Sequence, residues 1–210
     1  MKNTLLLTGI LFATMLHAQV TPNWVRYPSI SPDGKTVVFT YKGDLFSVPV
    51  TGGEARQLTY HKAHDYKAVW SRDGKTIAFA SDRYGNFDIF TIDAAGGPAK
   101  RLTFHSTDEH PFTFSADDKG VVFGAVRQDL AEHRQYPTRS QPELYKVPRN
   151  GGRVDQILTV PAEDVRISAD GNRYIYTTKK GEKMNSENTT PALLHAISGR
   201  TIPKPETTKS

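Results

Sequence analysis

Short strands separated by turns account for most of the pattern of apolar and polar positions along the chain. The runs 36–39 and 76–79 combine β-branched and aromatic residues, as buried strands require. In 44–48 the alternation places Leu45 and Ser47 on one face of a strand. The 16 glycines and 13 prolines also favour turn-rich β structure over long helices. The pattern therefore predicts an all-β chain.

A unit of three elements recurs along this pattern in a fixed order. A Ser-x-Asp-Gly turn leads into a buried strand, a Gly-Gly pair makes the next hairpin turn, and Leu-Thr closes the unit. The interval after the third turn is the longest, because 127–141 is an insertion. The turns begin at Ser31, Ser71, Ser115 and Ser168.

Four short strands in each unit of about 40 to 45 residues are typical of a propeller blade. The sequence thus predicts a partial β-propeller of four-stranded antiparallel blades, with about three full blades and the start of a fourth. A β-sandwich has similar turn spacing, but it would not repeat the same elements in the same order.

These repeats resemble the PD40, or WD40-like, repeat of TolB-type propellers and of the N-terminal region of tricorn-type serine peptidases. Prolyl oligopeptidase-like and dipeptidyl peptidases carry similar blades. The resemblance covers about Tyr27 to Lys180 and is specific for the type of blade, whereas one fold hosts many activities. The segment 81–88 matches the family's second hairpin, where Asp82 and Arg83 are expected to form a turn with a local charge pair.

The first residues, 1–18, have the three-part form of a secretory signal peptide. Lys2 is followed by the apolar run 5–16 and by the small residue Ala18. The run is shorter than the ~20 apolar residues of a membrane-spanning helix. We therefore expect cleavage, no membrane span after it, and export to the periplasm or the extracellular space, with propeller blades over 20–181.

The repeat stops after Lys180, and 182–210 is a polar, irregular segment without strand alternation. A disordered tail is one interpretation. Codons permitted for the segment also yield, in one shifted frame, words that resemble a continuing tricorn-type propeller. A frameshift near 181–183 is the alternative, and the parent would then be a larger exported peptidase of the tricorn-like S41 type.

No catalytic motif is present in the sequence. Gly-x-Ser-x-Gly is absent, and the lack of cysteine excludes thiol nucleophiles and disulfides. The serines of the repeats precede turns, where a hydroxyl bonds to backbone amides. We assign no catalytic, cofactor-binding or metal-binding residue, and the resemblance places the peptidase residues of such proteins downstream of the propeller.

Two equivalent loops carry histidines and acids, which raises the possibility of a metal site. Aligning Leu58 with Leu102 superimposes the two loops. A metal site would need three ligands that converge, and polar loops that ring one face of the channel are the favoured interpretation. There they would line a rim where a peptide enters. The rim residues are His61, His64 and Asp65 in one loop and His105, Asp108 and Glu109 in the next.

The expected function is that of a non-catalytic propeller region of an exported tricorn-like serine peptidase, which guides peptides or unfolded polypeptide to a downstream active site. One alternative is a TolB-like periplasmic module that binds an envelope protein. Another is the propeller of a prolyl oligopeptidase-like peptidase. The net charge of +5 could suit nucleic acid. However, the Lys and Arg residues form no run or stripe, so we expect no nucleic-acid partner.

Overall fold

The computed structural model describes residues 24–127, 142–158, 162, 164–171 and 173–177. Three four-stranded antiparallel sheets follow one another along the chain, and two strands of a further sheet come after them. The sheets form an open arc, so the predicted partial propeller is confirmed. The expectations for 1–18, for 182–210 and for most of the insertion 127–141 lie outside the described residues.

Each sheet is one blade, and its strands lie side by side in chain order. Blade 1 contains β1 (Arg26–Ile30), β2 (Thr36–Tyr41), β3 (Asp44–Pro49) and β4 (Arg56–Gln57). Blade 2 contains β5 (Asp65–Trp70), β6 (Thr76–Ser81), β7 (Asp88–Asp93) and β8 (Lys100–Arg101). Blade 3 contains β9 (Glu109–Phe114), β10 (Gly120–Ala125), β11 (Glu143–Pro148) and β12 (Asp155–Leu158), and the further sheet contains β13 (Asp164–Ile167) and β14 (Tyr174–Thr177).

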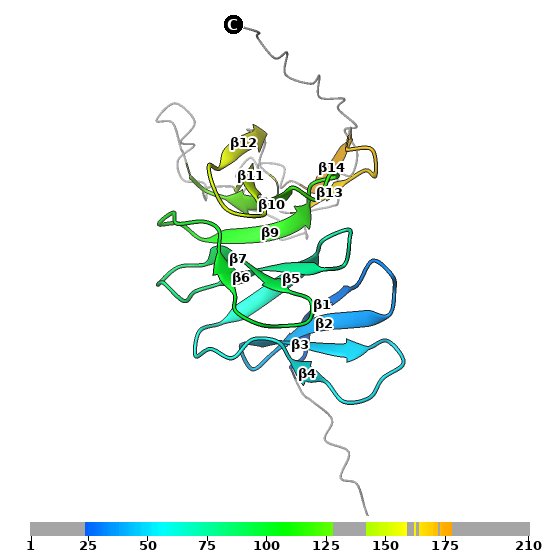
Figure 1. Ribbon diagram of the computed structural model, residues 1–210. Helices are drawn as coiled ribbons and strands as arrows, with labels where there is room; N and C mark the ends of the chain where they lie inside the picture. The colour runs from blue at the N-terminus through cyan, green and yellow to red at the C-terminus, as the bar shows by residue number, and fades with distance from the viewer. Residues whose placement is uncertain (1–23, 128–141, 159–161, 163, 172, 178–210) are drawn as a thin grey trace, which may run out of the picture.

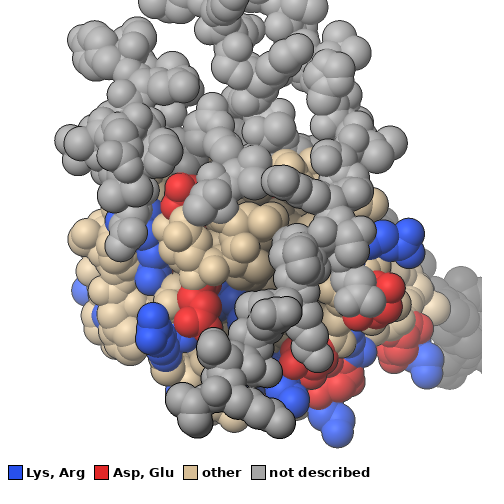
Figure 2. All heavy atoms as spheres, turned by 90° about the horizontal axis from the view of Figure 1, so that it is seen from above, with Lys and Arg blue, Asp and Glu red and all other residues tan. Residues whose placement is uncertain are grey.

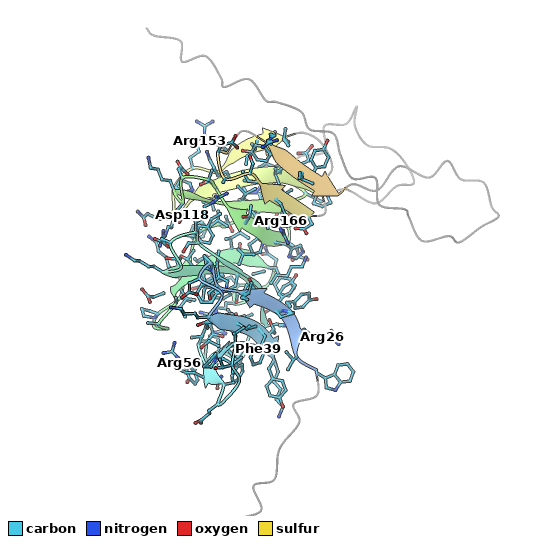
Figure 3. The ribbon with its side chains drawn as sticks, turned by 90° about the vertical axis from the view of Figure 1, so that its right-hand side faces the viewer. Arg26, Phe39, Arg56, Asp118, Arg153 and Arg166 are labelled. Carbon is cyan, nitrogen blue, oxygen red and sulfur yellow. The ribbon has the colours of Figure 1, made fainter. Side chains whose placement is uncertain are left out.

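The blades stack face to face, from β1–β4 at the bottom of Figure 1 to β9–β12 at the top. The first strands of successive blades pack against one another, β1 on β5, β5 on β9 and β9 on β13. Figure 3 shows Arg26 of β1 and Arg166 of β13 on one side of the stack and Arg56 of the outer strand β4 on the other. The first strands therefore form the inner wall of the arc. Within the described residues, no helix is long and apolar enough to cross a membrane.

The Ser-x-Asp-Gly turn is closed by the same hydrogen bonds in each blade. In blade 1, Ser31 Oγ donates to Asp33 Oδ1 (2.6 Å) and accepts from the backbone N of Thr36 (2.9 Å). The same bonds recur at Ser71, Ser115 and Ser168. In blade 3 the place of Gly34 (φ 71°) is taken by Asp118, which also adopts a positive φ, of 57°. The turn serines thus bond to backbone amides, as the sequence predicts.

The core lies between the blades, because both faces of a central strand are covered. On β6, Ile77 and Phe79 pack with Val38 and Leu45 of blade 1, whereas Ala78 packs with the cluster of blade 3. A third cluster joins blade 3 to β13 and β14. Each blade is consequently stabilised by its neighbours, as expected for stacked repeats.

Candidate functional site

Two loops connect the outer strand of one blade to the inner strand of the next, and we call residues 59–65 and 103–109 the rim loops. Each loop ends at the first residue of an inner strand. The backbone N of that residue donates to the hairpin between the second and third strands of the previous blade. Asp65 N donates to Gly43 O, and Glu109 N donates to Phe87 O, both at 2.7 Å. The six predicted residues therefore lie at one end of the blades, in equivalent positions of adjacent blade boundaries.

The two acids that open the inner strands are fully buried and paired with arginine. Asp65 Oδ2 lies 2.8 Å from the guanidinium of Arg83, and Glu109 Oε1 lies 2.7 Å from Nε of Arg127. Arg83 lies over the ring of Phe90 at 5.1 Å, and Arg127 is placed in the same way in the next blade. The rim therefore depends on both arginines, because loss of either one would leave a buried, unpaired carboxylate.

His61 and His105 hold the bends of the two rim loops. Nδ1 of His61 accepts the backbone N of Ala63 at 3.0 Å, and Nδ1 of His105 accepts the backbone N of Thr107 at 3.2 Å. Burial and the charge of Arg127 lower the pKa of His105. Both imidazoles thus serve as acceptors within their own loops.

His64 and Asp108 link the rim loops to the hairpins beside them. The backbone N of His64 donates to Asp82 Oδ1 at 2.7 Å, and Asp108 Oδ1 accepts the backbone N of Phe87 at 3.0 Å. Asp82 and Arg83 therefore do not form the local charge pair suggested by the sequence, and each has another partner. Asp82 caps the neighbouring loop, and the buried carboxylate of Asp65 attracts Arg83 instead.

Aromatic and imidazole rings from three successive blades meet just inside the rim loops. Tyr66 of β5 is at the centre, and its hydroxyl lies 2.8 Å from Nδ1 of His110 on β9. The rings of Tyr27 (5.3 Å), His64 (5.4 Å) and Phe87 (4.8 Å) surround it. We call these five residues the aromatic platform. Tyr27 is 41% exposed and His64 is also exposed, so the platform faces solvent at the inner end of the rim.

Burial shifts the titration of the two hydrogen-bonded groups of the platform. It lowers the pKa of His110 to about 4, with a further contribution from the charge of Lys67, and it raises the pKa of Tyr66. At neutral pH the platform therefore offers a neutral imidazole and a neutral phenol. Such a surface can stack on a planar group and exchange hydrogen bonds with a peptide backbone.

No three His, Asp or Glu side chains within the described part of the chain are grouped so that they could hold a metal ion. On the face drawn in Figure 2, the basic and acidic side chains of these residues lie interspersed.

Residues 22–188 match the family model described as the tricorn protease N-terminal beta propeller domain. The match covers most of the chain. The chain belongs to this family. Its tricorn-type propeller blades account for the stacked sheets and for the rim loops at one end of them.

The chain matches only part of each of three longer proteins. Dipeptidyl-peptidase 5 of Porphyromonas gingivalis is 35% identical over 77 residues, which are 32% of this chain and 11% of the relative. The crystal structure of TolB from Acinetobacter baumannii superimposes with a TM-score of 0.60 at 18% identity, over 83% of this chain and 43% of TolB. The tricorn protease gives 0.60 at 22% identity, over 77% of this chain and 16% of the protease. The chain thus spans about a tenth of the curated relative, and the two structures share its fold.

Two features of the tricorn-type rim are absent from the sequence-based prediction. The arginine partners of Asp65 and Glu109 follow them at the same separation of 18 residues, a repeat that a comparison of the blades could have found. His110 adjoins a predicted rim residue, but its partner Tyr66 is 44 residues away. The platform combines rings from several blades, so only the folded arc brings them together.

Proposed function

We propose that the chain is the N-terminal propeller region of an exported tricorn-like serine peptidase, and that it guides peptides or unfolded polypeptide to a catalytic domain that it does not itself contain. The family match over 22–188 supports the tricorn part of this proposal. The local similarity to a protein named dipeptidyl-peptidase supports a peptidase parent. The signal-peptide form of 1–18 supports export.

The aromatic platform is the observation that carries the guiding role. Three of its rings, those of Tyr27, Tyr66 and His110, stand at the starts of adjacent inner strands, where the rim loops meet the inner wall of the arc. Neutral aromatic and imidazole groups bind extended chains with little dependence on side-chain sequence, since every peptide offers backbone donors and acceptors. A surface that passes many different peptides needs this tolerance.

The experiment is a titration of the full chain with a fluorescent, unstructured peptide that contains no arginine, followed by anisotropy. His64→Ala removes an exposed ring of the platform, and Tyr66→Phe removes the hydroxyl bonded to His110. Each should weaken binding by about threefold to tenfold, the value of one aromatic contact or one hydrogen bond. Tyr60→Ala is the matched control, because Tyr60 lies on the same rim, 76% exposed, and outside the platform.

Unchanged affinity in both platform variants would show that the platform does not bind peptide. Binding of a folded envelope protein at the same rim, with no binding of unstructured peptide, would favour a TolB-like binding module instead.

A further inference from the structure

The blade boundaries differ from one another at the end opposite the rim loops, where the Ser-x-Asp-Gly turns lie. The residue after the third strand donates its backbone N to the same turn lysine in each blade. Ala94 donates to Lys75 O at 2.9 Å in blade 2, and Arg149 donates to Lys119 O at 2.8 Å in blade 3. Ala94 and Arg149 therefore occupy equivalent positions.

Arg149 reaches from blade 3 to the turn of blade 2. Its NH1 lies 3.1 Å from Asp73 Oδ2, and its NH2 bonds to Thr76 Oγ1. Its guanidinium also lies over the ring of Phe114 at 5.9 Å. A carboxylate, a hydroxyl and an aromatic face together satisfy the planar cation at this boundary.

The boundary between blades 1 and 2 repeats these three groups without the arginine. Asp33, Thr36 and Trp70 stand at the positions of Asp73, Thr76 and Phe114 relative to their turn serines. All three line a groove of about 770 Å³, and Ala94 lines it where Arg149 would stand. This volume lies within the range of about 300–1,000 Å³ that ligand pockets occupy.

The carboxylate of Asp33 is held in its turn by the same hydrogen bonds as that of Asp73. In both turns Oδ1 accepts the serine hydroxyl and the lysine backbone N. Asp73 Oδ2 then binds Arg149, whereas Asp33 Oδ2 has no hydrogen-bond or ion-pair partner among the described residues. The bonds from Ser31 and the backbone of Lys35 lower the pKa of Asp33, so it is charged at neutral pH.

The two arginines that line the groove do not fill this position. Arg56 donates to the backbone carbonyls of Ala94 and Ala95, and Lys100 makes the equivalent contact to Asn150 O in the next boundary. Arg72 donates to the carbonyls of β13 and the turn after it. Glu54 adds a further carboxylate to the lining.

We propose that the groove between blades 1 and 2 binds the arginine side chain of a separate, extended peptide. The guanidinium pairs with Asp33 Oδ2, donates a hydrogen bond to the hydroxyl oxygen of Thr36 and lies on the ring of Trp70. An indole face attracts such a cation more strongly than the phenyl face of Phe114 does. The site lies at the turn end of the blades and is independent of the rim.

The test is a titration of the full chain with the tripeptide acetyl-Gly-Arg-Gly-amide, followed by isothermal calorimetry and by tryptophan fluorescence. The same tripeptide with citrulline, which has the shape of arginine without its charge, is the matched ligand control. The arginine peptide should bind and change the emission of Trp70, and the citrulline peptide should bind at least about tenfold more weakly.

Two variants locate the binding. Ala94→Arg supplies the guanidinium from the chain itself and should abolish binding, with an unchanged or higher Tm that shows the protein is folded. Asp33→Asn should weaken binding by about tenfold or more, because a charge-assisted bond is lost. Asp155→Asn changes an exposed acid of blade 3 outside the groove and should leave binding unchanged.

Arg149→Ala supplies an independent check, since it should open a second groove of the same kind and raise the number of bound tripeptides. No binding by the unaltered chain, equal binding of the citrulline peptide, or full binding by Ala94→Arg would each overturn the proposal. The peptide used to test the rim contains no arginine. The two titrations therefore report on the rim and on the groove separately, and a negative result in one does not change the meaning of the other.

Discussion

The boundary between blades 1 and 2 and the boundary between blades 2 and 3 share a backbone but are held by different side chains. Gln57 of the first boundary corresponds to Arg101 of the second, and Ala94 corresponds to Arg149. At these two positions the second boundary therefore carries arginines that are each paired with an acid, and the first boundary does not. The turns thus define the repeated frame, whereas substitutions within it decide which boundary is closed by charge pairs and which keeps an open groove.

The acid that opens the third strand is also more deeply buried in the second boundary, where Asp88 takes the place of Asp44. Asp88 and Glu109 are both fully buried, and Arg101 lies 2.7 Å from Asp88 Oδ2. Asp88 Oδ1 has no hydrogen-bond partner among the described residues. Burial raises the pKa of Asp88 to about 6 in spite of Arg101, and the nearby charge of Glu109 adds to the shift. The equivalent Asp44 instead accepts neutral donors from Gln57 and Thr59.

The largest effect should come from removing the arginine of a buried pair. Arg127→Ala leaves Glu109 buried without its partner and should lower the free energy of unfolding by about 3–5 kcal/mol, measured by urea denaturation. Arg153→Ala breaks an exposed pair with Asp155 and should cost at most ~0.5 kcal/mol. Equal losses in the two variants would mean that the second boundary does not depend on its buried charges.

Asp88 should give this boundary a pH dependence of its own. Its pKa is about 6 in the folded chain and near 3.8 when unfolded, so the folded state holds the extra proton between these values. The stability that Asp88 contributes is complete below pH 3.8 and is lost as the pH rises through 6, by at most ~1.4 kcal/mol per pH unit. Urea denaturation of the unaltered chain and of Asp88→Asn from pH 4 to 7 measures this contribution. The free energy of unfolding of the unaltered chain, relative to that of Asp88→Asn, should fall as the pH rises.

His110 should give the opposite slope. Its pKa is lowered to about 4 in the folded chain, against 6.5 for the free side chain. The unfolded state therefore binds the extra proton between these values, and the stability contributed by His110 rises with pH from 4 to 6.5. His110→Asn should remove this rise in the same titration. A slope of the same sign as that of Asp88 would contradict the burial of the imidazole.

Blades 2 and 3 also differ in packing, on the face of blade 3 that meets β13 and β14. Ala68 and Ala80 of blade 2 correspond to Phe112 and Gly124 of blade 3. A Cβ on Gly124 would lie 2.5 Å from the ring of Phe112. Gly124→Ala should therefore cost about 1–3 kcal/mol in urea denaturation. Adding Phe112→Ala should give a total loss smaller than the sum of the two single losses, and strict additivity would disprove the contact.

The smallest effect concerns the turn that joins blades 2 and 3. The carboxylate of Asp118 accepts the backbone N of Arg72 and of Asp73, both at 2.8 Å. Asp118→Gly keeps the positive φ without strain but loses both bonds, so the free energy of unfolding should fall by about 1 kcal/mol. Asp118→Asn retains an acceptor oxygen and should lose less. A loss as large in Asn as in Gly would show that the charge itself matters.

The sequence predicts the blades because their turns are local. Ser31, Asp33 and Thr36 lie within a few positions of one another, so the motif alone determines the hydrogen bonds that close the turn. The equivalence of the two rim loops also follows from aligning Leu58 with Leu102.

The chemistry of the rim is less accessible to prediction. Asp65 and Glu109 are typical of solvated loops by residue type, and only the fold shows that they are buried against arginine. The aromatic platform and the groove between blades 1 and 2 each combine residues of different blades. No local sequence pattern shows which of these residues face one another.

We propose above that this tricorn-type propeller region belongs to a peptidase. The direct measurement is the intact mass of the native protein, with the gene read from the codon of Gly181 to well beyond that of Ser210. We expect a secreted product much larger than 210 residues, with further blades and a serine peptidase domain after them. A native product that ends at Ser210, with nothing resembling a propeller in any frame after it, would contradict the peptidase parent and leave a short binding module.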